Sequence, residues 1–177
     1  MTSKQFIGLV FAGLIAAGAV IVPLNMCADI YGLFRSAAGR RVVVSGEART
    51  SKYLHSFRYI PENFDGVLLG SSVSENLATK DFRGYRIYNA SINGGNVEDV
   101  KPIADNIYRR GNLKLTILCI HRYLTNDHAR KTDLMTPKQY WGALGSPQLL
   151  TAYLSRVAVR LGLVPSKFDE YGSVDYG

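Results

Sequence analysis

Three segments of the sequence carry side chains that could take part in catalysis, and each comes directly after a short apolar run. A serine on a tight turn exposes its hydroxyl as a nucleophile, and a glycine such as Gly94 lets a backbone N–H approach a developing oxyanion. Residues of this kind after strands are candidates for a functional site, although Gly-Ser-Ser and Asn-Gly-Gly are also ordinary turn sequences. The segments are Gly70-Ser71-Ser72, the stretch from Asn89 to Asn96, and His121-Arg122-Tyr123, which leads on to Asn126-Asp127-His128.

The apolar runs before these segments predict the strands of one parallel sheet, at residues 65–69, 86–90 and 115–120. Between the last two, residues 97–110 have apolar side chains at helical spacing behind an Asn96 N-cap. Strand, helix and strand in this order indicate an α/β fold, a small three-layer parallel-sheet domain with its site at the carboxyl ends of the strands. The almost wholly apolar run 115–120 is expected to be covered on both faces.

The remaining elements are predicted from local signals. Residues 42–44 could form a short strand, 51–61 are undecided between helix and loop, and 74–80 fit a helical turn. Cap-then-proline starts predict helices at 136–144 and 146–162. On these helices we expect Tyr140 and Trp141 to be packing residues, and Arg156 and Arg160 to form a solvated face.

The N-terminal part of the chain contains an apolar stretch, from Phe6 to Leu24, without a single charge. As a helix it is about 28 Å long, close to the thickness of the bilayer hydrocarbon core. We interpret it as an uncleaved membrane anchor. The alternatives are a cleaved signal peptide with Ala17 and Ala19 as its A-x-A site, a buried core helix, or a lipid-modified Cys27.

These features divide the chain into three parts: an anchor at residues 1–28, a linker at 29–64 that leads into the domain, and the α/β domain at 65–177. Lys4 precedes the anchor, whereas Arg35, Arg40 and Arg41 follow it. This distribution would keep the domain cytoplasmic under the positive-inside tendency, although large domains translocate despite such charges. Orientation therefore has to come from other observations.

Charge and cysteine content exclude several functional classes. The net charge is +7, but Lys and Arg are scattered, which favours an anionic membrane surface or acidic polymer over nucleic acid. Cys27 and Cys119 lie in unrelated settings and predict neither a disulfide framework nor a metal site. With no P-loop, dinucleotide fingerprint or zinc spacing in the sequence, we expect no cofactor.

Two blocks of the sequence resemble the SGNH (GDSL-like) hydrolase superfamily: Val67 to Ser72, and Tyr88 to Gly94. The segment from Asp29 to Arg35 is similar to the exit segment of its membrane-anchored envelope branch, which is related to polysaccharide O-acetylation proteins. The resemblance covers roughly residues 29–120. It implies an inner-membrane, periplasm-facing esterase or acetyltransferase acting on acyl groups of envelope or exported polysaccharide. Ser72 would be the nucleophile, and the N–H groups of Ser72 and Gly94 would form the oxyanion hole.

The sequence departs from this family at its catalytic base. The asparagine of the third block is replaced by His121-Arg122-Tyr123, and no Asp-x-x-His motif follows Ser146. The histidines are His55, His121 and His128, of which His121, with Asp127 nearby, is the candidate base. The alternative is a truncated or degenerate, catalytically inactive accessory that binds glycan or a partner protein, such as a polysaccharide-export or acetylation protein.

Overall fold

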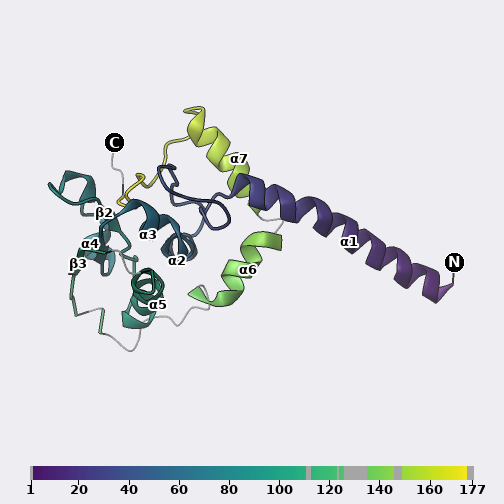
Figure 1. Ribbon diagram of the computed structural model, residues 1–177, viewed down its shortest axis with the longest axis horizontal. Helices are drawn as coiled ribbons and strands as arrows, with labels where there is room; N and C mark the ends of the chain where they lie inside the picture. The colour runs from purple at the N-terminus through teal and green to yellow at the C-terminus, as the bar shows by residue number, and fades with distance from the viewer. Residues whose placement is uncertain (1, 111–112, 123, 126–134, 146–148, 175–177) are drawn as a thin grey trace.

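The computed structural model (Figure 1) describes residues 2–110, 113–122, 124–125, 135–145 and 149–174. Helix α1, Ser3–Ala28, extends away from the rest of the chain and begins with a capping box between Thr2 and Gln5. It is long and apolar enough to be a membrane span or a signal sequence, and none of its most apolar stretch is buried. The predicted N-terminal apolar helix is therefore confirmed.

The chain leaves α1 through Asp29, whose backbone is left-handed with φ 40°. Its buried carboxylate accepts hydrogen bonds from the backbone N–H groups of Leu33, Phe34 and Arg35, and pairs with Arg40 at 2.8 Å. The segment predicted as a linker is thus folded back on itself. It also contributes to the core, since the following side chains are buried: Ile30, Leu33, Ala37 and Val42.

Three short strands form the predicted parallel sheet. They are β1 (Gly66–Leu69), β2 (Ile87–Asn89) and β3 (Leu115–Leu118), and their order is β2-β1-β3. Leu68 is paired with Asn89 on one side and Ile117 on the other. The α/β class and all three strands are confirmed, whereas residues 42–44 belong to no strand.

Helices pack around this sheet. The undecided stretch is helical, as α2 (Ala48–Phe57) and α3 (Tyr59–Asn63). The turn after β1 is α4 (Ser72–Glu75) with a 3-10 turn at Thr79–Asp81. Helix α5 (Val97–Tyr108) has the expected Asn96 cap, and α6 (Pro137–Gly145) and α7 (Leu149–Arg160) lie near α1 (Figure 1).

Burial differs between the middle and the edge of the sheet. Val67 and Leu69 of β1 join Ile103 and Ile107 of α5 in the main core, and Leu68 on the other face is buried as well. In contrast, Leu118 and Ile120 are 51% and 71% exposed. The expectation that 115–120 is covered on both faces was wrong, because the face of β3 that carries Leu118 and Ile120 is left exposed by the described residues.

The last described residues pack against β2, the outer strand on the other side of the sheet from β3. Phe168 and Val174 form an antiparallel bridge, and the Tyr171 carbonyl accepts a hydrogen bond of 2.7 Å from the Asn89 N–H of β2. Gly172 has φ +77°, and a Cβ there would lie 2.6 Å from both the Asn89 carbonyl and the Tyr88 ring. Only glycine allows the tail to approach β2 this closely.

The packing predictions for α6 and α7 were partly wrong. Tyr140 packs against Phe57, with ring centroids 4.9 Å apart, as expected. Trp141 is 67% exposed. Arg156 does more than face solvent, because it donates hydrogen bonds to the carbonyls of Ile30 and Arg41. The side chain of Arg160 lies outside the described residues.

A buried histidine occupies an aromatic part of the core. His55 of α2 is fully buried, and its Nδ1 is hydrogen bonded to the Tyr88 hydroxyl at 2.8 Å. Its Nε2 has no partner among the described residues. Burial, with smaller contributions from Arg156 and Lys52, lowers the pKa of His55 to about 3. The imidazole is therefore neutral in the folded protein at ordinary pH.

This burial predicts an acid sensitivity that can be traced to one side chain. Because the pKa of His55 is near 3 when folded and 6.5 when unfolded, the unfolded chain binds the extra proton between these pH values. Stability from this group is full above pH 6.5 and falls by roughly 3–5 kcal/mol on acidification to pH 3. His55→Gln, which keeps a partner for Tyr88, is expected to flatten the curve of unfolding free energy against pH. Parallel wild-type and variant curves, from urea unfolding in detergent, would contradict this assignment.

Candidate functional site

The strand register brings the three segments that carry candidate catalytic residues together at the carboxyl ends of the strands, which form one edge of the sheet. Beyond the strands, the Ile92 N–H donates to the Gly70 carbonyl at 3.0 Å, and the Cys119 N–H donates to the Leu69 carbonyl at 2.8 Å. The residues that follow β1, β2 and β3 therefore lie side by side. The turn that holds Ser72 is flanked by the loop of Gly94 and by the end of β3, from which His121 follows.

Ser72 is the first residue of α4, behind the N-cap Ser71. Its side chain is partly exposed, and within the described part of the chain its hydroxyl forms no hydrogen bond. The turn before it is very tight. A Cβ on Gly70 would lie 2.2 Å from the Ser74 Oγ and 3.0 Å from the Cys119 Cβ, so a side chain at this position would push α4 off the sheet.

Gly94 lies in an exposed loop with φ +62°, a conformation that favours glycine. Arg49 of α2 fixes this loop. Its guanidinium donates to the Asn93 carbonyl at 2.9 Å and pairs with Asp99 at 2.6 Å. Asp99 in turn closes the capping box of α5 with Asn96. The loop is therefore held between two helices, a role for Arg49 that the sequence analysis missed.

Asn89, at the end of β2, connects this loop to α4. Its amide nitrogen lies 2.8 Å, 3.1 Å and 3.0 Å from the carbonyl oxygens of Ser74, Glu75 and Leu77. Its side-chain oxygen accepts a hydrogen bond from the Ser91 N–H. A single buried amide thus fixes the end of α4 relative to the start of the loop that carries Gly94.

A buried ion pair makes a second connection between the same elements. Lys52 of α2 has no exposed surface, and its Nζ lies 3.2 Å from Glu75 Oε1 and 2.7 Å from the Ser91 carbonyl. Burial lowers the pKa of Lys52 to about 8, and Glu75 opposes part of that shift. The ammonium also lies 5.0 Å from the Phe168 ring. Nothing in the sequence analysis pointed to Lys52 or Glu75.

The histidines do not complete a catalytic triad in the described structure. His121 follows β3 at the same edge as Ser72 and is partly exposed, but the two side chains are not hydrogen bonded. His55 is sequestered in the core beside Tyr88. Asp127 and His128 lie outside the described residues. The structure therefore brings together Ser72, Gly94 and the start of the His121 segment, without a base placed on the serine.

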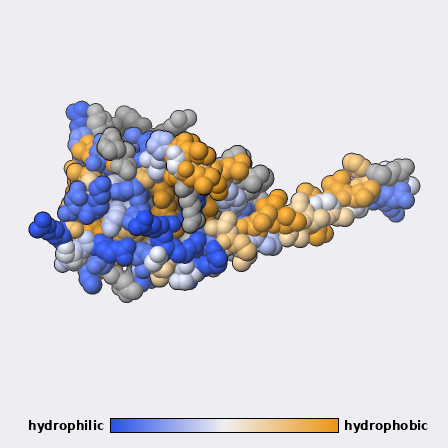
Figure 2. Space-filling model, turned by 90° about the horizontal axis from the view of Figure 1, so that it is seen from above, coloured by the Kyte–Doolittle hydropathy of each residue, from blue (hydrophilic) through white to orange (hydrophobic). Residues whose placement is uncertain are grey.

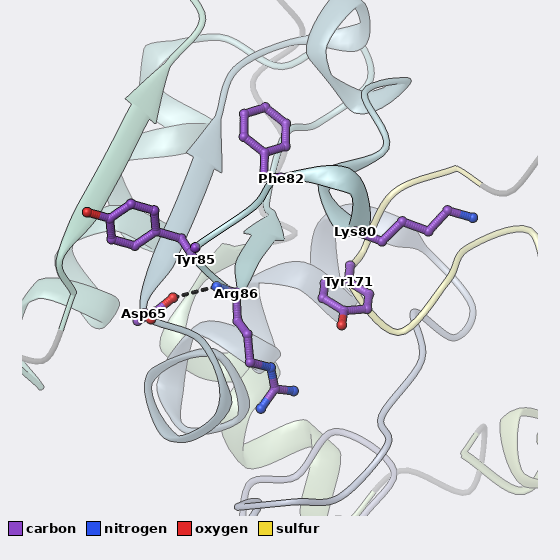
Figure 3. Close-up of a pocket in the computed structure, with 7 residues that line it drawn as sticks. Asp65, Lys80, Phe82, Tyr85, Arg86 and Tyr171 are labelled. Atoms are coloured by element: carbon purple, nitrogen blue, oxygen red, sulfur yellow. Dashed lines mark hydrogen bonds between the residues drawn. The ribbon is translucent and has the colours of Figure 1, made fainter.

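A metal site and a ligand pocket each set their own requirements for the described residues. Among the described residues, no group of three or more His, Cys, Asp or Glu side chains could hold a metal ion. A pocket of about 300 Å³ lies by the strand starts, at the end of the sheet opposite Ser72 (Figure 3). Its side chains, including Lys80, Tyr85 and Arg86, point in different directions and do not converge on one ligand position.

The buried ion pair leads to a stability prediction. Lys52→Met leaves the Glu75 carboxylate buried without its partner and is expected to cost about 3–5 kcal/mol of unfolding free energy. Lys52→Met combined with Glu75→Leu removes both charges and should recover a large part of that loss. Denaturant unfolding of the detergent-solubilised chain measures both values.

An exposed pair provides the control for this experiment. Lys101 and Asp105 are 2.6 Å apart on α5, with side chains 70% and 44% exposed. Lys101→Met should change the stability by less than about 1 kcal/mol. Equal effects of Lys52→Met and Lys101→Met would show that the Lys52 pair does not hold the site together.

Comparison with known proteins gave no match: no protein-family model, curated protein or solved structure is similar to this chain at a significant level.

Proposed function

We propose that this chain is a membrane-anchored SGNH-like serine esterase or acetyltransferase, with Ser72 as its nucleophile. The observation that carries the proposal is the meeting of Ser72 and Gly94 at one sheet edge. Each is on a turn that only glycine permits, at Gly70 and at Gly94 itself. The buried contacts of Asn89 and Lys52 hold both turns in place. Rigid positioning of this kind is what a nucleophile and an oxyanion hole require.

The reaction follows from these positions. The Ser72 Oγ attacks the carbonyl carbon of an ester, and its proton passes to a base. The backbone N–H groups of Ser72 and Gly94 bind the negative oxygen of the tetrahedral intermediate. The alcohol leaves with the proton from the base, which gives an acyl-Ser72 ester. Water, or a sugar hydroxyl, then takes the acyl group and restores the serine.

His121 is the residue that we assign as base. It follows β3 at the edge where Ser72 lies, and it is partly exposed, unlike His55. Catalytic hydrogen bonds often tighten only when substrate is bound, so their absence in the free protein does not exclude this role. Asp127 is its proposed partner.

The substrate and location follow from α1 and from the family resemblance. Helix α1 would cross the inner membrane and place the domain in the periplasm, close to the bilayer surface. Acyl groups on envelope or exported polysaccharide are the substrate class that the resemblance implies. A helix that tethers the domain at the surface would keep it beside such polymers as they leave the membrane.

A second candidate function is a catalytically inactive accessory that keeps the sheet and the loops around Ser72 but binds glycan or a partner protein. The observation that favours it is the state of Ser72, because no described side chain is hydrogen bonded to its hydroxyl. The two candidates differ in whether the serine is activated.

The serine can be tested directly with a fluorophosphonate probe on the purified, detergent-solubilised chain. An activated Ser72 is expected to form a covalent adduct, since the probe reacts with serines that a base deprotonates. Ser72→Ala should abolish labelling, and His121→Gln should slow it by about 100-fold or more. Ser155→Ala, on the exposed part of α7, is the control that should label normally. No labelling of folded wild-type chain would leave the inactive accessory as the function.

The oxyanion hole gives an independent prediction. Gly94→Ala keeps the N–H but forces a side chain into φ +62°, so the loop should move and labelling should slow by about 10-fold or more. Gly84→Ala is the control. Gly84 has φ +87° and nothing near its Cβ, so an alanine there imposes a similar backbone strain at the opposite end of the sheet, by the strand starts. Equal labelling rates for the two variants would exclude Gly94 from the oxyanion hole.

A further inference from the structure

Several large apolar side chains of α6 and α7 are exposed and do not belong to the core. Leu154, Val157 and Leu161 follow one another at a spacing of three and four residues, which places them on one helical stripe. Figure 2 shows hydrophobic surface on the domain beside the base of α1. Six large apolar or aromatic side chains on α6, on α7 and directly after α7 are 51% to 72% exposed: Trp141, Leu154, Val157, Leu161, Leu163 and Val164. We call these six residues the α6–α7 surface.

The last turn of α1 holds this surface in place. Asn25 is buried, and its side-chain amide donates to the Leu144 carbonyl of α6 at 2.6 Å. The hydroxyl of Tyr153, on α7, donates to the side-chain oxygen of the same asparagine. Both helices therefore meet α1 where it joins the domain, as Figure 1 shows. Any membrane that α1 crosses ends next to them.

Two exposed arginines lie near the same junction. Arg35 is exposed and donates to the Cys27 carbonyl at the end of α1 at 2.5 Å. Arg41 is exposed as well and pairs with Glu170 at 2.8 Å, and its carbonyl is joined to that of Ile30 through Arg156. The whole chain carries a net charge of +7. Apolar side chains flanked by cations are the pattern of helices that bind the surface of an anionic bilayer.

We propose that the α6–α7 surface docks on the lipid bilayer that α1 crosses. Its apolar side chains would lie among the acyl chains of anionic phospholipids, near the headgroups. The bilayer is the occupant that α1 itself brings to this position, and the exposed Trp141 suits the membrane–water interface. The inference rests on the membrane-anchoring part of the proposed function. Docking would fix the orientation of the domain, so that the sheet edge with Ser72 is held at a constant height above the membrane.

Trp141 allows a direct test because it is the single tryptophan of the chain. The full-length protein is reconstituted in vesicles of phosphatidylcholine and phosphatidylglycerol, with or without phosphatidylcholine brominated near the headgroup end of its acyl chains. Contact with lipid is expected to shift the Trp141 emission to the blue and to quench most of it in the brominated vesicles. Emission that is unquenched overturns the proposal, even when it is blue-shifted, because a protein neighbour would shift it without bromine contact.

Three reporters in a Trp141→Phe background complete the experiment. Leu161→Trp is expected to be quenched like the wild type, whereas Tyr108→Trp, at an exposed position on α5 and away from α1, should remain unquenched. Val10→Trp, within α1, reports the anchor and should be quenched by deeply brominated lipid. If position 10 is quenched while positions 141 and 161 behave like 108, docking is wrong and the anchor stands. If position 10 is also unquenched, the anchor itself is wrong and docking falls with it.

Discussion

The hydrogen bonds of one buried side chain, Asn89, hold the candidate site together. Its amide binds three carbonyls at the end of α4, its oxygen binds the loop after β2, and its backbone N–H holds the tail through Tyr171. Three segments of the chain, including the distant tail, therefore meet at a residue without exposed surface. Because unsatisfied buried carbonyls cost free energy, no apolar residue could replace this asparagine without freeing the Ser72 turn.

The buried pair of Lys52 and Glu75 has the same effect at a greater cost. Removing two charges from water offsets most of their attraction, so such a pair is a poor source of stability compared with two apolar residues. Its contribution here is orientation. The ammonium binds Glu75 of α4 and the Ser91 carbonyl of the next loop, and thereby fixes the distance between the turns that carry Ser72 and Gly94. That constraint is useful for a nucleophile and equally useful for a rigid binding edge.

Much of this arrangement could be predicted from the sequence because it depends on local signals. The Asn96 cap, the three apolar runs and the small residues after them predicted α5, the parallel sheet and the shared edge of Ser72 and Gly94. Burial that depends on distant neighbours could not be predicted. Lys52 and His55 lie in an amphipathic stretch where charged residues usually face solvent, yet both are buried. The exposure of Ile120 likewise depends on what lies beside β3, which no local pattern specifies.

Packed and hydrogen-bonded side chains also connect the candidate site to the end of α1. Helix α2 carries both Arg49 and Lys52, which position the site, and its Phe57 packs against Tyr140 of α6. Helix α6 is in turn hydrogen bonded, through its Leu144 carbonyl, to the side-chain amide of Asn25 at the end of α1. A continuous series of packed side chains therefore runs from the end of α1 to α4, which begins with Ser72. Where α1 crosses a bilayer, as proposed, this series would hold the Ser72 turn at a fixed position relative to that bilayer.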